Sequence, residues 1–168
     1  MSIVLMLVLG SGLSGQNEKA AFFFAEGVAF AEAEDWQNAI DQIRLAVEKD
    51  PENALYHYFL GGCHYELGEY VEAIRHLNEA LGQNINLVKA YFKRGMSYYQ
   101  LSKYKNAIQD FDQVIERESS FAEAYYYRGK CKMTKLDLGG AWSDYRKSIK
   151  QKPSSLGTLF KDVATSLF

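Results

Sequence analysis

Proline is nearly absent from this chain, whose 168 residues contain only Pro51 and Pro153. Proline breaks helices because it lacks a backbone N–H and clashes with the preceding turn, so its scarcity favours a mostly helical chain. Long apolar runs are missing too. The unbroken run at residues 3–9 spans seven residues, far fewer than the roughly 20 that a membrane-spanning helix needs. The sequence therefore predicts no transmembrane span.

The sequence also lacks the residue groupings that enzymes use. It has no CxxC pair, no phosphate-cradling glycine loop and no Ser/His/Asp grouping. His57 and His64 lie seven residues apart, whereas two histidines that bind a metal from one helix are spaced by four. We expect them to be hydrogen-bonded histidines of a helix interface. The sequence predicts no catalytic residue, no metal, no cofactor and no enzymatic activity.

Charge of either sign is balanced overall but unevenly distributed. The formal net charge is −2. Residues 1–87 hold 4 Lys/Arg and 13 Asp/Glu, a net charge of −9, and residues 88–153 hold 14 Lys/Arg and 7 Asp/Glu, a net charge of +7. Either two solvated surfaces differ in charge, or opposite ends steer a polarised partner or a second copy of the chain.

The first fifteen residues resemble a secretory signal. The apolar run is followed by Gly12-Leu13-Ser14, a small–x–small cleavage pattern, but no Lys or Arg precedes the run. A disordered tail, a truncated start, or an apolar segment that covers the first repeat of the chain would also account for it. If this segment is a signal, we expect the protein to be periplasmic or secreted. Otherwise we expect it to be cytoplasmic.

A period of 34 residues organises the rest of the chain. Four glycines and four alanines repeat at this step, and the two prolines lie three steps apart; these small and helix-ending residues are Gly27, Gly61, Gly95, Gly129, Ala39, Ala73, Ala107, Ala141, Pro51 and Pro153. Such a period is typical of stacked helix–turn–helix units. It divides the single domain, residues 16–168, into repeats at 20–53, 54–87, 88–121 and 122–155.

Position 1 is the first residue of each repeat, which is Ala20 in the first. In every repeat the sequence predicts one helix over positions 1–14 and another over positions 17–30. The glycine at position 8 has no Cβ and lets the second helix approach closely, opposite the alanine at position 20 and a large residue at position 24. Cys63 and Cys131 occupy one position two repeats apart. A disulfide needs Cα atoms within about 7 Å, so we expect two small buried side chains and no bridge.

These repeats resemble the tetratricopeptide repeat (TPR) family, whose pattern has an aromatic residue at position 4, Gly at 8, Tyr at 11, Ala at 20 and Phe at 24. The third repeat fits best, with Tyr91, Gly95, Tyr98, Ala107 and Phe111. The resemblance implies an all-α solenoid, a right-handed superhelix of nine helices. The ninth, residues 156–168, carries one apolar stripe and is expected to cap the last repeat.

In this family the first helix of each repeat lines a concave groove, which usually holds a segment or helix of a partner. Position 5 is aromatic in all four repeats, and a stripe of this kind packs between repeats or faces the groove. The expected groove residues are Phe24, Tyr58, Tyr65, Lys89, Phe92, Lys93, Met96, Tyr99, Tyr126 and Lys130.

One sub-family clamps a C-terminal carboxylate with Lys and Asn at positions 5 and 9 of its first repeat, where this chain has Phe24 and Val28. We therefore infer no such clamp, although the groove lysines could hold an acidic group.

The sequence thus predicts a non-enzymatic scaffold that binds another protein, whose identity it does not give. Self-assembly through the acidic and basic ends is the alternative, which would make the chain a homo-oligomer. Single-stranded nucleic acid is a weaker alternative for the basic third and fourth repeats, which carry aromatic residues.

Overall fold

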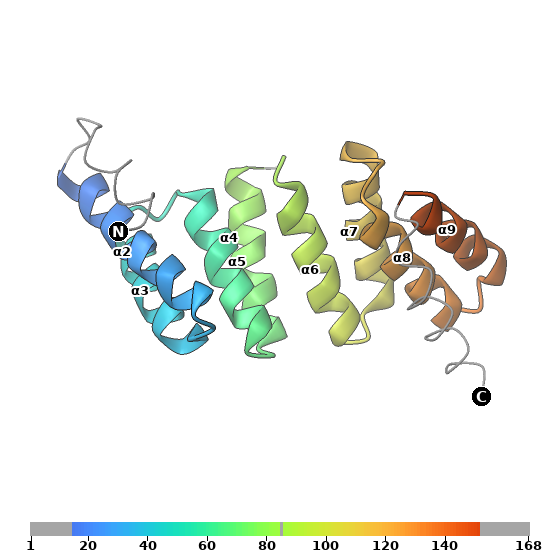
Figure 1. Ribbon diagram of the computed structural model, residues 1–168, viewed down its shortest axis with the longest axis horizontal. Coiled ribbons are helices and arrows are strands. Elements are labelled where there is room, and N and C mark those ends of the chain that lie inside the picture. Colours follow the sequence, from blue (N-terminus) through green and yellow to red (C-terminus); the bar gives the residue numbers. More distant parts are fainter. Residues whose placement is uncertain (1–14, 85, 152–168) are drawn as a thin grey trace.

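The computed structural model describes residues 15–84 and 86–151, and these form eight helices in a single row (Figure 1). The helices are α2 (Gly15–Glu32), α3 (Trp36–Lys49), α4 (Ala54–Glu66), α5 (Tyr70–Gln83), α6 (Val88–Gln100), α7 (Tyr104–Arg117), α8 (Ala122–Thr134) and α9 (Leu138–Gln151). Both predicted helices of every repeat are present, and α2 begins five residues before the first repeat. The all-α solenoid is confirmed; residues 1–14, Pro153 and the predicted cap lie outside the described residues.

Each helix packs against its neighbours in sequence. The two helices of a repeat share the largest contacts, and each second helix then packs against the first helix of the next repeat. First helices also contact one another, as in α2 with α4, α4 with α6 and α6 with α8. Because the first helices are the more closely spaced layer, they line the inner side of the row.

The repeat glycines pack as predicted. A Cβ on Gly61 would lie 2.8 Å from Leu77 Cγ and 3.1 Å from the Ala73 carbonyl oxygen, and a Cβ on Gly95 would lie 2.9 Å from a ring carbon of Phe111. Each of the four repeat alanines on the facing helix is fully buried. Only a residue without a side chain lets the two helices come this close.

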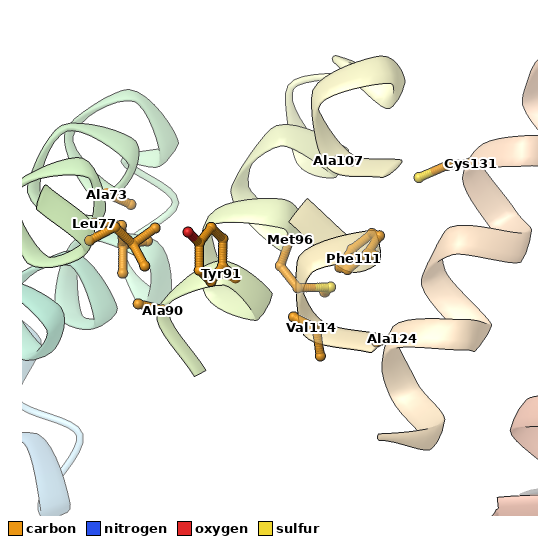
Figure 2. Packing of buried hydrophobic residues seen from close by; sticks show 11 residues of the cluster. Ala73, Leu77, Ala90, Tyr91, Met96, Ala107, Phe111, Val114, Ala124 and Cys131 are labelled. Carbon is orange, nitrogen blue, oxygen red and sulfur yellow. The ribbon is translucent and has the colours of Figure 1, made fainter. Parts of the chain in front are cut away.

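The buried residues form a core that runs along the row rather than one central cluster. Its largest part joins repeats 2, 3 and 4, where Leu77, Tyr91, Met96 and Phe111 lie among the buried residues (Figure 2). Cys131 belongs to the same cluster, and Cys63 to the cluster that joins repeats 1 and 2. Both cysteines are buried and unbridged, as the sequence predicts.

The turn inside each repeat contains one residue in the left-handed region of backbone space. These residues recur at the 34-residue step as Glu34, Gly68, Ser102 and Leu136, with φ of 58°, 78°, 56° and 60°. The next residue closes the first helix by donating its N–H to a carbonyl five residues back, as Glu69 does to His64 at 2.9 Å. The turn is therefore identical in four repeats, although only one of them has the glycine that favours it.

Candidate protein-binding groove

A hollow on the inner side of the row lies where repeats 1, 2 and 3 meet. Its volume is about 190 Å³, and its lining residues come from α2, α3, α4 and α6: Ala31, Trp36, Tyr58, Phe59, Gly62, Cys63, Glu66 and Lys93. Five of these eight residues belong to α4. We call this hollow the groove pocket.

The groove pocket is apolar except at one edge. There, Lys93 Nζ donates to Glu66 Oε1 at 2.9 Å and lies 4.7 Å from the ring centre of Tyr65. The side chains of Lys93 and Glu66 are 26% and 38% exposed, so both remain accessible to a ligand. Burial raises the pKa of Tyr58 despite the nearby Lys93 ammonium, so its hydroxyl stays protonated and able to donate a hydrogen bond at neutral pH.

The aromatic residues at position 5 do not share one role. Tyr58 lines the groove pocket. Phe24 instead packs on Tyr56 and Phe59 of the next repeat, with ring centres 4.7 and 5.1 Å apart. Phe92 likewise packs on Tyr127 of the next repeat, with ring centres 6.1 Å apart. The half-buried Phe24 and Phe92 therefore join successive repeats.

Met96 departs from the prediction that it lines the groove. It is only 9% exposed and belongs to the buried core cluster, near Phe111 and Val114 (Figure 2). The other predicted residue at position 9, Lys130, is half-buried. An unbranched methionine fills the space where α6 meets its neighbours.

The remaining predicted residues lie nearer the basic end. The Lys130 ammonium lies 5.7 Å from the ring centre of Tyr99 and 5.5 Å from that of Tyr126, which places a positive charge between two half-buried rings. Lys89 is exposed on α6. The structure thus brings Tyr58 and Lys93 together in the pocket and Tyr99, Tyr126 and Lys130 in a second group.

Of the eight pocket residues, only Tyr58 and Lys93 belong to the expected groove residues, and the others include Trp36, Phe59 and Glu66. Tyr58, Gly62 and Glu66 are spaced by four along α4, so they share one helical face, and this spacing could have identified Glu66 from the sequence. Trp36 begins α3 and reaches the pocket only because of how α3 packs on the next repeat. No sequence pattern gives that contact.

Within the described part of the chain, no three or more His, Cys, Asp or Glu residues are placed to bind a metal ion. No described helix is long and apolar enough to cross a membrane.

Comparisons with known proteins agree with this geometry. Two tetratricopeptide repeat models match the sequence, one over residues 24–86 and the other over residues 88–121. Among curated proteins, none matches closely enough to count as a relative.

Three solved structures illustrate the likeness. MamA has a TM-score of 0.79 and 20% identity, over 90% of this chain and 86% of MamA. YrrB, described as a TPR protein with an unusual peptide-binding site, has a TM-score of 0.78 and 24% identity, over 85% of this chain and 74% of YrrB. The first TPR of Spaghetti (RPAP3), bound to the HSP90 peptide SRMEEVD, has a TM-score of 0.70 and 24% identity, over 71% of this chain and 95% of the Spaghetti chain.

Proposed function

Because the chain belongs to the tetratricopeptide repeat family, we propose that it is a non-enzymatic scaffold that holds a peptide or helix of another protein in its concave groove. The observation that carries this proposal is the groove pocket, an apolar hollow with a single accessible ion pair at its edge. Two of the similar solved structures are described by peptide binding or a bound peptide. Their identity to this chain is too low to transfer a particular partner.

The pocket fits one apolar or aromatic side chain of a ligand. Its volume of about 190 Å³ is smaller than a drug-sized ligand site, which spans roughly 300–1,000 Å³. Tyr58 and Trp36 offer aromatic surface together with a hydroxyl and an indole N–H, a combination common in binding sites. Glu66 and Lys93 can exchange their mutual hydrogen bond for polar groups of the ligand backbone.

The two tryptophans of the chain provide the test. Trp36 lines the groove pocket, whereas Trp142 on α9 is 58% exposed and lies outside it. Peptides selected on the full-length protein from a random displayed library are titrated into the Trp142→Phe variant, in which fluorescence reports on Trp36 alone. A ligand in the pocket shifts Trp36 emission and binds at least tenfold more weakly to Tyr58→Ala.

The matched control is Trp142→Ala, which should bind the selected peptides as tightly as the unmodified chain does. Selected peptides that leave Trp36 emission unchanged and bind Tyr58→Ala normally would contradict the proposed pocket.

Charge favours self-assembly as a second candidate function. The first described helix, α2, exposes Glu18, Glu26 and Glu32, and the last, α9, exposes Arg146, Lys147 and Lys150. End-to-end contact would bring these opposite charges together. Sedimentation in low salt should then detect oligomers that dissociate in high salt, and a monomer in low salt excludes this assembly.

A further inference from the structure

Repeat 2 contains three histidines stacked in the buried space between its two helices. His57 and His64 on α4 and His76 on α5 are each 7–8% exposed. The His76 ring centre lies 5.7 Å from that of His57 and 5.3 Å from that of His64, with interplanar angles of 28° and 6°. All three histidines of the chain therefore lie between α4 and α5.

Hydrogen-bond partners fix the proton positions on two of the rings. The Pro51 carbonyl oxygen can only accept, so His57 Nε2, at 2.9 Å, carries a proton. Arg75 Nη2 can only donate, so His76 Nε2, at 2.8 Å, is unprotonated. When both rings are neutral, His76 Nδ1 therefore donates to His57 Nδ1 across 3.4 Å.

This chain of hydrogen bonds leaves no place for an additional proton. A proton on His57 Nδ1 would face the N–H of His76, and a proton on His76 Nε2 would face the guanidinium of Arg75. Either one replaces a hydrogen bond with two opposed donors in a buried site, which is strongly unfavourable. The neutral rings stabilise the closed repeat, and an added proton opposes it.

The surrounding charges act in the same direction. Burial, Arg75, His64 and His57 lower the pKa of His76 to about 3, and only Glu72 acts to raise it. His64 Nδ1 lies 2.6 Å from Glu69 Oε2, so a proton on His64 would be balanced by that carboxylate but would place positive charge against the His76 ring. Arg94 of α6 bonds Asn78 and Asp110 instead, and the charged groups that shift the pKa of His76 all lie on α4 and α5.

We propose that His57, His64 and His76 form an acid-sensitive latch, which holds α4 on α5 while the rings are neutral and releases the pair when His76 takes up a proton. Opening repeat 2 would also displace the five residues that α4 contributes to the groove pocket, a consequence that rests on the proposed function. The latch itself is tested without any ligand.

The proton linkage sets the expected size of the effect. An exposed histidine in the open repeat has a pKa of about 6.5, whereas His76 in the closed repeat has a pKa of about 3. The open form therefore binds more protons between these values, and the latch is strongest above about pH 6.5 and weakens as the pH falls. For one histidine, the equilibrium constant for opening rises about 30-fold from pH 7.5 to pH 5.0.

Repeat 1 provides the control variant, because it has Phe23, Phe30 and Gln42 at the three equivalent positions. The variant His57→Phe/His64→Phe/His76→Gln gives repeat 2 the same non-titrating set. Hydrogen exchange of α4 and α5, corrected for intrinsic rates, should show the 30-fold rise in the unmodified chain and less than about a threefold rise in the variant. Equal rises in the two proteins would overturn the proposal.

Two further measurements keep the test decisive if the triple variant does not fold. His76→Gln alone can still donate to His57 and accept from Arg75, so it should lose most of the acid response while remaining folded at pH 7.5. Nitrogen-15 spectra of the unmodified chain at pH 7.5 should show the proton of His76 on Nδ1 and that of His57 on Nε2. The opposite tautomers, or an unchanged acid response in His76→Gln, would overturn the latch.

Discussion

Repeat 2 and repeat 4 place their helices in the same way but fill the space between them with different chemistry. Position 23 is His76 in repeat 2, stacked against the rings of two other histidines, and Asp144 in repeat 4. Arg128 donates to both oxygens of Asp144 at 2.6 and 2.8 Å, and Lys132 adds a third hydrogen bond at 2.8 Å. Repeat 3 resembles repeat 4, with Arg94 bound to Asp110 at 2.6 and 2.8 Å.

The difference shows that what this fold requires at position 23 is a satisfied polar group and not a particular charge. His76 and Asp144 are 7% and 1% exposed. Within the described residues, no buried side-chain nitrogen or oxygen lacks a hydrogen-bond partner. An unpaired group in such a place costs about 1–3 kcal/mol and a charged one more, so the partner matters more than the residue type. The two repeats should therefore differ in how they respond to acid and to loss of a partner.

The largest expected effect is the loss of the buried carboxylate from repeat 4. Asp144→Ala leaves Arg128, whose side chain is 13% exposed, and Lys132 without their shared partner. We expect a loss of about 3 kcal/mol in the free energy of unfolding, measured by urea denaturation followed by circular dichroism. Asp112→Ala is the control, because Asp112 also bonds Arg128 but is 49% exposed; it should cost under about 1 kcal/mol. Equal losses of stability in the two variants would show that burial does not determine how much these ion pairs contribute.

The second effect should be the same in both repeats, because the two helices of each repeat make the same close contact at the repeat glycine. Gly61→Ala and Gly129→Ala place a Cβ 2.8 Å from Leu77 and 2.9 Å from Tyr145. We expect each to destabilise the protein by about 2 kcal/mol in thermal or urea unfolding. Gly62→Ala, one residue further along α4, meets no atom within 4 Å and should be neutral or stabilising by up to about 1 kcal/mol. A stabilising Gly61→Ala would contradict the packing.

A third effect separates the repeats at the turn, where repeat 2 has Gly68 and repeat 4 has Leu136, both with positive φ. A left-handed conformation costs an ordinary residue about 1–2 kcal/mol and glycine little. Because Leu136 is 83% exposed, Leu136→Gly loses almost no burial and should raise the free energy of unfolding by about 1 kcal/mol. Gly68→Leu should lower it by a similar amount. A fall in the free energy of unfolding for Leu136→Gly, or a rise for Gly68→Leu, in urea titrations would show that the turns are not equivalent.

The smallest effect concerns the cations beside the two buried groups. Arg75 helps to keep His76 unprotonated, so Arg75→Met should raise the pKa of His76 from about 3, while burial, its first cause, still holds it below the ordinary value. Burial favours the neutral carboxyl of Asp144, but hydrogen bonds from Arg128 and Lys132 outweigh it and lower the pKa. Lys132→Met should therefore raise the pKa of Asp144.

Both shifts can be followed by nuclear magnetic resonance titration of the side chains, and both predict a smaller loss of stability in acid. The stability due to His76 is present above about pH 6.5 and lost toward about pH 3, so Arg75→Met reduces this loss. The stability due to Asp144 is present above its ordinary pKa of 3.8 and lost as the pH falls through its lowered value, so Lys132→Met makes that loss smaller. A fall in either pKa would contradict the contacts described here.

The sequence alone determined the repeat architecture. The step of 34 residues gave the paired helices, and the lack of a Cβ on Gly27, Gly61, Gly95 and Gly129 gave their close contact. These features were predictable because periodicity and small residues act within one repeat. The burial of Cys63 and Cys131 followed in the same way.

Only the tertiary structure decided which aromatic residues line the groove and what the histidines do. Phe24 and Tyr58 occupy the same position, yet one packs on the next repeat and the other lines the pocket. Likewise, no local spacing joins His57 and His64 on one helix to His76 on another. Contacts between repeats depend on the shapes of side chains far apart in the sequence, and the state of a buried proton depends on every partner around it.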